Sequence, residues 1–539
     1  MDESIAQSCR HGLGVLRLMP ERQVSTPNDC FDASERSGEH ELKLQWDILL
    51  YLMQFLDKPN MSRLMRTCKT LYEHGMPALI KSCHLRMSAP DDEASHAFCS
   101  FLLKSSSRPL HLRELRITDR TPRQMAAYTN GQRLAVVFAE VISQAMNLQV
   151  LHISGFKAML APDNTDHFRS VVEHLTNLRV IQVSPMDRLV LSVLEKIPSP
   201  LRKVILGPSG TAVEPSPLPL LHYLQPFEGT LEEIEVEPAP SGFFSYREHG
   251  IRFYHIHTLT VRLMTVTVGV TVDDLVTSFP NLRVLALYTH DFYRTREILP
   301  STDDLLVERN LRLARRAEGW PSLDRLVCPV KWAYVSALRK VKLWERVALG
   351  PTNYLDLPEE IHRFHAVLED IRPTHVDVII NVNRIRPADI FPTADIAHLN
   401  IDLVGFELLF KQDGSSDWLD GPMRGVVSAV KNLSRLVFLS IRLHSVTGPL
   451  QRFDDDEPIR AALTALDCEK HIHVLAQTLP NLQHVVIQFK FPDLERGDVF
   501  WASPTAAARF NKDSGNISIK EISYALKDYP FAGRLWPWL

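Results

Sequence analysis

The chain has 539 residues, of which 45% are hydrophobic and 23% charged, so we expect most of it to be globular rather than disordered. Its formal net charge of −4 gives no electrostatic reason to expect binding to nucleic acid or to an anionic membrane. There is no secretory signal and no apolar run of about 18 residues, so we expect the chain to be cytoplasmic, nuclear or both.

The cysteines indicate the redox compartment, and the short motifs bear on catalysis. The seven cysteines are odd in number and scattered, without the spacing of metal ligands, which favours a reducing compartment. The motifs of serine hydrolases, zinc proteases, P-loop NTPases and dinucleotide-binding enzymes are absent from the sequence. We therefore expect no catalytic residue, no metal and no cofactor, and neither nucleic acid nor membrane as a partner.

The first regular pattern lies at 41–87, after a polar segment at 1–40 that has the composition of a flexible tail. Apolar residues recur here at spacings of three and four, which predicts two amphipathic helices and the start of a third. Pro59 ends the first helix, and Asn60 or Ser62 can cap the second. Some forty residues bury too little surface to be stable alone, so we expect this helical unit to pack against another surface.

A short phrase then recurs from Leu112 onward: an apolar residue, two others, an apolar residue, one other and an apolar residue. The alternation at its end is typical of a strand, and an Asn before several copies places a turn there. Helical patterns lie between the copies, so neighbouring strands should be parallel. The copies begin at Leu112, Leu148, Leu178, Leu201, Leu231, Ile256, Leu282, Leu323 and Leu338, with weaker ones at His375, Ile396, Leu436 and Leu482.

This repetition predicts an α/β solenoid with parallel strands over 96–490. The step from Leu323 to Leu338 is only 15 residues, too short for a comfortable crossover helix. We therefore expect one of these two strands to be irregular, or the phrase there to be coincidental. The phrase is lost in a C-terminal extension at 491–539, whose final Trp and Pro residues are typical of a segment that seals the end of a core.

Both patterns resemble known families. The repeats resemble leucine-rich repeats in their L-x-x-L-x-L strand phrase, although the Asn or Cys expected shortly after it is absent. The stretch from Leu44 to Leu85 resembles an F-box, with LQWDIL where that family has L-P-x-E-[IL]-[LIV], and TCKTLY as its later part. Gln45 replaces the usual Pro. The order of the two parts is similar to that of fungal-type F-box proteins with irregular repeats.

The resemblance implies a short helical F-box followed by an irregular leucine-rich-repeat-like horseshoe. It implies a non-catalytic substrate receptor of an SCF-type ubiquitin ligase, in which the F-box docks on a Skp-family adaptor, and through it on a cullin-RING scaffold, while the solenoid binds a protein substrate. On this resemblance, the residues expected to contact the adaptor are Leu44, Trp46, Ile48, Leu49, Leu52, Leu56, Leu64, Cys68, Leu71 and Tyr72.

Other clusters allow either a binding role or an ordinary solvated one. Arg309, Arg312, Arg315 and Arg316 share one face of a predicted helix, which could receive an acidic or phosphorylated substrate or simply face water. His255 and His257 share a strand face without a third metal ligand. The acidic run at 454–457 could bind calcium or a basic peptide, or be a solvated loop.

A different class of function fits the same patterns. The helical unit could serve as a terminal cap of the repeats, and the chain would then be a protein-interaction scaffold with no role in a ligase. Binding to a Skp-family adaptor separates the two hypotheses.

Overall fold

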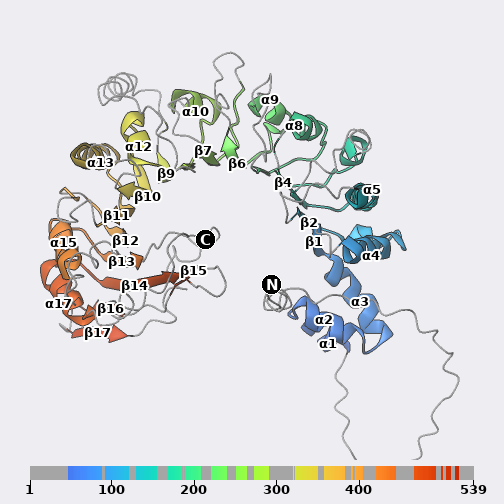
Figure 1. The fold of residues 1–539 in the computed structure, drawn as a ribbon, viewed down its shortest axis with the longest axis horizontal. Helices are drawn as coiled ribbons and strands as arrows, with labels where there is room; N and C mark the ends of the chain where they lie inside the picture. The colour runs from blue at the N-terminus through green and yellow to red at the C-terminus, as the bar shows by residue number, and fades with distance from the viewer. Residues whose placement is uncertain are drawn as a thin grey trace, which may run out of the picture. The chain divides into compact units, whose positions relative to one another are not determined.

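The computed structural model describes the helical unit, most of the repeats and part of the C-terminal extension (Figure 1). The predicted tail at 1–40 lies outside the described residues. The chain divides after Leu231 into two compact units, and both are of α/β type with parallel strands. The described residues are 46–87, 92–119, 129–154, 168–184, 186, 188–207, 220–239, 251–263, 272–289, 320, 322–349, 357–382, 390–392, 395–404, 420–444, 467–492, 499–501, 506–511 and 516–520.

Unit 1, residues 1–231, begins with the helical unit and continues as a row of parallel strands in chain order, β1 to β5. Helices lie along one side of this row (Figure 1). The elements are α1 (Trp46–Met53), α2 (Lys58–Met65), α3 (Lys69–Ile80), β1 (Ser82–Met87), α4 (Asp92–Leu103), η3 (Pro109–His111), β2 (Glu114–Asp119), α5 (Thr129–Gln144), β3 (Val150–Ser154), β4 (Val180–Ser184), α8 (Arg188–Leu194), β5 (Lys203–Leu206), α9 (Leu220–Leu224) and η4 (Gln225–Phe227).

Unit 2, residues 232–539, continues the pattern with parallel neighbours among β6 to β14, and ends with antiparallel strands beside β14. Its elements are β6 (Glu233–Ala239), β7 (Thr258–Leu263), α10 (Val272–Ser278), β8 (Val284–Thr289), β9 (Leu323–Val327), α12 (Val330–Ser336), β10 (Val341–Leu349), α13 (Leu357–Ile371), β11 (His375–Asn381), β12 (His398–Val404), α15 (Asp420–Val430), β13 (Phe438–His444), α17 (Cys468–Thr478), β14 (His484–Pro492), β15 (Val499–Trp501), β16 (Ala506–Asn511) and β17 (Asn516–Lys520).

The recurring phrase builds the core because its second apolar position is buried in each strand that carries a copy of it. In unit 1, Leu115, Leu151, Ile181 and Val204 are direct neighbours in the parallel register, and all four are buried. The intervening strand residues are half-buried, as the period of two requires. The buried side chains of the strands and the buried apolar side chains of the helices together form the hydrophobic core.

The Asn residues before the strands connect each repeat to the one before it. The side-chain amides of Asn147, Asn177 and Asn281 each donate a hydrogen bond of 2.9 Å to a backbone carbonyl of the preceding repeat. Asn481 does the same to the carbonyl of Ser434. The predicted turns are therefore also cross-repeat hydrogen-bonding positions.

The structure confirms the irregularity expected at the step from Leu323 to Leu338 and locates it in β10, whose register with β11 shifts between Trp344 and Val347. Both strands of the 15-residue step form, and the short helix α12 joins them. The inward position opposite Leu326 is taken by Trp344, so the repeat at β10 begins three residues later than the phrase predicts. The irregularity is a shift of register, and Trp344 fills the core against Phe364 at a ring-centroid distance of 5.3 Å.

A second difference concerns the end of the predicted helical unit. Residues 82–87 were predicted within that unit, but they form β1, which pairs with β2 in parallel register. Ile80, Cys83 and Leu85 are buried and follow the repeat phrase. The row of strands therefore starts directly after α3.

Candidate docking surface

The three helices α1, α2 and α3 pack around a small core made largely of methionine. Met53, Met61, Met65 and Met76 are buried. Gly75 on α3 allows this close packing, because a Cβ there would lie 2.6 Å from Cγ of Met65 and would also overlap Met53. Flexible thioether side chains thus fill the space between three short helices.

The cap of α2 differs from the prediction, and α3 has a cysteine as its cap. Asp57, not Asn60 or Ser62, caps α2, and its carboxylate accepts a hydrogen bond of 2.9 Å from the backbone N–H of Asn60. Pro59 lies in the first turn of α2, where its missing N–H costs no helical hydrogen bond. At the start of α3, the Cys68 thiol accepts from the backbone N–H of Leu71.

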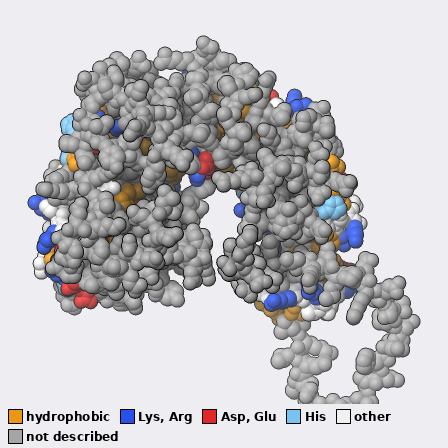
Figure 2. All heavy atoms as spheres, viewed as in Figure 1, with side chains coloured by type: hydrophobic (Ala, Val, Ile, Leu, Met, Phe, Trp, Pro, Cys, Tyr) orange, Lys and Arg blue, Asp and Glu red, His pale blue; other side chains and the backbone are white. Residues whose placement is uncertain are grey.

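One side of α1 leaves its apolar side chains exposed. On α1, Ile48 is 47% exposed, Tyr51 60% and Leu52 44%, and Phe55 in the turn directly after α1 is 68% exposed. We call these four residues the α1 apolar face. They follow the helical spacing of three and four, and the rings of Tyr51 and Phe55 meet edge to face at a centroid distance of 4.9 Å. Hydrophobic side chains are visible at the surface of this helical unit, next to Lys and Arg side chains (Figure 2).

The predicted adaptor-contact residues fall into distinct groups. Ile48, Leu52 and Tyr72 are exposed, the last at 42%. Leu71 is buried, so it belongs to the internal core of the unit and not to its docking surface. Leu44 lies outside the residues described, as does the side chain of Trp46, although its backbone begins α1. The half-buried members of the predicted set are Leu49, Leu56, Leu64 and Cys68.

Two exposed residues, Tyr51 and Phe55, were not among the predicted contacts. Both are aromatic, and aromatic side chains contribute strongly to protein interfaces. A signal for them was present in the sequence, because they lie three and seven residues after Ile48 on the same helical face.

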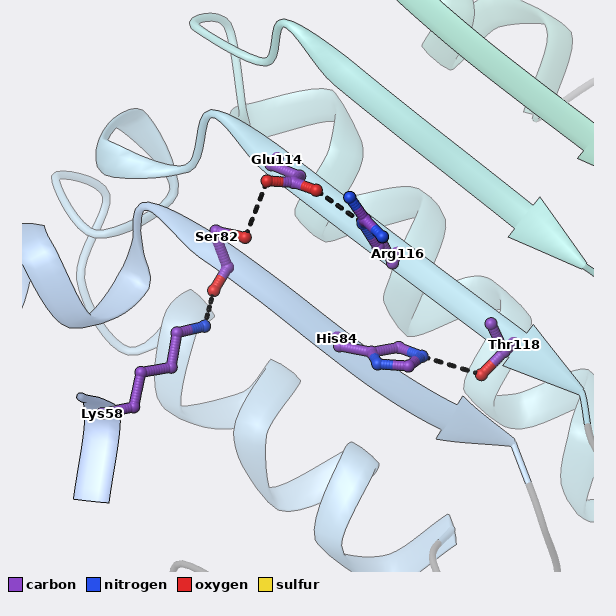
Figure 3. Close-up of polar contacts among 6 residues, drawn as sticks. All are labelled: Lys58, Ser82, His84, Glu114, Arg116 and Thr118. Atoms are coloured by element: carbon purple, nitrogen blue, oxygen red, sulfur yellow. Dashed lines mark hydrogen bonds and ion pairs between the residues drawn. The ribbon is translucent and has the colours of Figure 1, made fainter. Parts of the chain in front are cut away.

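The helical unit is joined firmly to the strands that follow it (Figure 3). The Lys58 ammonium group on α2 donates to the backbone carbonyl of Ser82 at the start of β1. The Ser82 hydroxyl donates to Glu114 on β2 at 2.8 Å, and Arg116 pairs with the same carboxylate at 2.5 Å. Burial acts to raise the pKa of Glu114, but these donors outweigh it and lower the pKa below its usual value.

Among the residues that the structure describes, the other predicted clusters supply no second site. Arg309, Arg312, Arg315 and Arg316 lie outside the described residues, as does the acidic run at 454–457. His255 is exposed, and His257 lies 4.0 Å from the Glu232 carboxylate. Within the part of the chain that is described, no group of three or more His, Cys, Asp and Glu could hold a metal ion.

The buried cysteines are held as thiols. Burial raises the pKa of Cys83 and of Cys99 to about 12, and that of Cys468 to about 11. A protonated thiol is a weak nucleophile, so these three residues serve the core. No described helix is both long and apolar enough to cross a membrane.

Comparison with known proteins gave no match for this sequence, either among protein-family models or among curated proteins.

Proposed function

We propose that this chain is the substrate-recognition subunit of an SCF-type ubiquitin ligase. The helical unit would act as an F-box that docks on a Skp-family adaptor, and through it on a cullin-RING scaffold. The strand and helix repeats would act as an irregular leucine-rich-repeat-like solenoid that binds a protein substrate. The chain itself would be non-catalytic, because ubiquitin transfer would take place on other subunits.

The α1 apolar face is the observation that supports docking. The methionine core already gives α1 an inward side, so Ile48, Tyr51, Leu52 and Phe55 are not needed for internal packing. Two aliphatic and two aromatic side chains at helical spacing are the kind of surface that binds in an apolar groove of a partner. Their burial there would stabilise a complex at roughly 25 cal/mol per Å² of apolar area removed from water.

Co-expression with a Skp-family adaptor and affinity purification test the proposal. Leu52→Asp places a charge in the centre of the α1 apolar face and should abolish co-purification, because a buried unpaired carboxylate costs several kcal/mol. Val136→Asp is a matched control: Val136, on α5 of the same unit, is 46% exposed and lies outside the α1 apolar face. Retained capture of the adaptor by Leu52→Asp would contradict the proposal.

A scaffold function without a ligase is the second candidate, and one observation favours it. Helix α3 ends at Ile80 and the chain enters β1 at Ser82, the first strand of the row. The helical unit is thus placed as a terminal cap would be, and repeat proteins need such caps. Failure of the wild-type chain to capture any Skp-family adaptor would favour this second function.

A further inference from the structure

The residue just before each strand of unit 1 belongs to a continuous column across the sheet. The backbone N–H of Arg113 donates to the carbonyl of Lys81 at 2.9 Å. Gln149 then donates to Arg113, Arg179 to Gln149 and Arg202 to Arg179, each at 2.8 Å. Direct hydrogen bonds fix these five residues as lateral neighbours, at the strand spacing of about 4.8 Å. We call Lys81, Arg113, Gln149, Arg179 and Arg202 the basic column.

All members of the basic column except Gln149 carry a positive charge at neutral pH. Lys81, Arg179 and Arg202 are exposed, and Arg113 is half-buried. The Arg113 guanidinium donates to the carbonyls of Leu110 at 2.8 Å and Asn147 at 3.3 Å, which orients it without neutralising its charge. The column is therefore a line of cations with one neutral position in its middle.

Unit 2 provides an internal comparison, because its repeats have the same backbone geometry at this position. His257 donates to Glu232, Arg283 to His257 and Asp324 to Arg283, at 2.8 to 3.0 Å. Later repeats continue with the same pattern through Ala397, Val437 and Gln483. Acidic, basic, polar and apolar residues all occur there, so the fold does not require a cation before a strand. The run of cations in unit 1 needs another explanation.

The charges next to the column favour an anionic partner. Lys203 follows Arg202 at the start of β5 and adds a cation beside the column. The carboxylate next to Arg113, that of Glu114, is engaged by Ser82 and Arg116. An arriving carboxylate would therefore meet guanidinium groups, which bind carboxylates in a two-pronged geometry.

We propose that the basic column binds an acidic segment of a protein partner, a stretch with several Asp or Glu side chains. Nucleic acid is disfavoured, because the chain as a whole has a net charge of −4, which opposes attraction to a polyanion. The inference rests on the proposed function in one respect: the partner with the acidic segment would be the substrate of the ligase. Binding to the column requires no adaptor.

Fluorescence anisotropy with the full chain tests this proposal. The probe is a labelled peptide of alternating Glu and Ser, and the same peptide with Gln for Glu is its uncharged control. The double variant Arg179→Glu and Arg202→Glu should weaken binding about tenfold, since each exposed pair contributes about 0.2–1 kcal/mol and becomes repulsive. Gln149→Arg completes the column and should tighten binding about two- to threefold.

Arg283→Glu is the matched control, because Arg283 is exposed and holds the same repeat position in unit 2. It should bind the Glu peptide as the wild type does. Circular dichroism of all variants checks the fold, which should be unchanged because Glu232 and Asp324 occupy this position natively. The gain expected from Gln149→Arg cannot arise from misfolding.

Three results would overturn the inference: no binding of the Glu peptide by the wild type, equal affinity in the double variant, or an equal loss in Arg283→Glu. Equal binding of a single-stranded oligonucleotide of the same charge would also overturn it, in favour of general attraction of polyanions. The adaptor is absent from this assay, so failure of adaptor docking and failure of the basic column are separate outcomes.

Discussion

Gly75 is the residue on which the packing of the helical unit depends most closely. A methyl group there would overlap Met53 and lie 2.6 Å from Cγ of Met65. Gly75→Ala gains up to about 1 kcal/mol of helix propensity, but overpacking a tight core typically costs about 1–3 kcal/mol. We expect a net loss of stability and weaker adaptor capture, seen as faster amide hydrogen exchange over 46–80.

Gly421→Ala is the control for this change. Gly421 lies in the first turn of α15, and a Cβ there meets no atom within 4 Å. Alanine should therefore leave exchange in α15 unchanged or slow it slightly. Unchanged exchange over 46–80 in Gly75→Ala would mean that the methionines move aside without cost.

At the same scale, helical spacing predicted which apolar residues of the helical unit share a helix face. It did not predict whether each of these residues is buried in the unit or exposed to solvent. Ile48 and Leu52 were predicted as contacts and are exposed, while Leu71 satisfies the same spacing and is buried. The difference depends on how α2 and α3 pack against α1, and this packing cannot be predicted from the spacing within one helix. Tyr51 and Phe55 share the helical spacing of Ile48, but only the packed positions of α2 and α3 show that this side of the unit stays exposed.

At the scale of elements, the repeat phrase predicted most strands because a buried position every repeat is a strong local signal. It failed where the signal was ambiguous. In β10, Val341 and Trp344 are both buried and lie opposite Leu323 and Leu326, so the repeat begins at Val341, although Leu338 three residues earlier also satisfies the pattern. Strand β1 was missed because Cys83 stands where other copies have Leu, Ile or Val.

Neighbouring strands of unit 2 place histidines side by side. The rings of His375 on β11 and His398 on β12 stack at a centroid distance of 4.2 Å with an interplanar angle of 11°, and Phe438 on β13 follows at 6.1 Å from His398. Burial, together with the charges of His375 and His484, lowers the pKa of His398 to about 4. Burial lowers the pKa of His375 as well.

This stack should make unit 2 sensitive to acid. The ordinary pKa of a histidine, about 6.5, applies to the unfolded chain, so that state binds more protons than the folded one between pH 6.5 and about 4. Stability is therefore fully present above pH 6.5 and is lost as the pH falls towards 4. Hydrogen exchange of β11–β13, corrected for the intrinsic effect of pH, should show declining protection from pH 7 to pH 5.

His398→Gln tests the assignment of this acid sensitivity, because glutamine does not titrate. The variant should show a shallower decline than the wild type. His255→Gln replaces an exposed histidine outside the stack and should decline as the wild type does. An identical decline in His398→Gln and the wild type would show that other groups cause the acid sensitivity.

At the scale of the whole molecule, both proposed partner surfaces lie in unit 1. The α1 apolar face is on the helical unit, and the basic column begins at Lys81, the residue that caps the C-terminus of α3. Helix α3 leads into β1 without a linker, and the Lys58 contact with Ser82 joins α2 to the same strand. Under the proposed function, this direct connection would help a receptor to hold one partner at a fixed place relative to another.

This continuity predicts that the helical unit depends on the strands for its stability. A peptide of residues 44–87 keeps the methionine core but loses the pairing of β1 with β2 and the Ser82 contact with Glu114. A chain of about 44 residues rarely forms a stable core without a partner. We therefore expect the peptide to show weak helical circular dichroism and no cooperative thermal transition. A fragment of residues 1–231, which keeps these contacts, should unfold cooperatively and capture the adaptor. A cooperative transition in the peptide alone would show instead that the helical unit is an autonomous domain attached to the repeats.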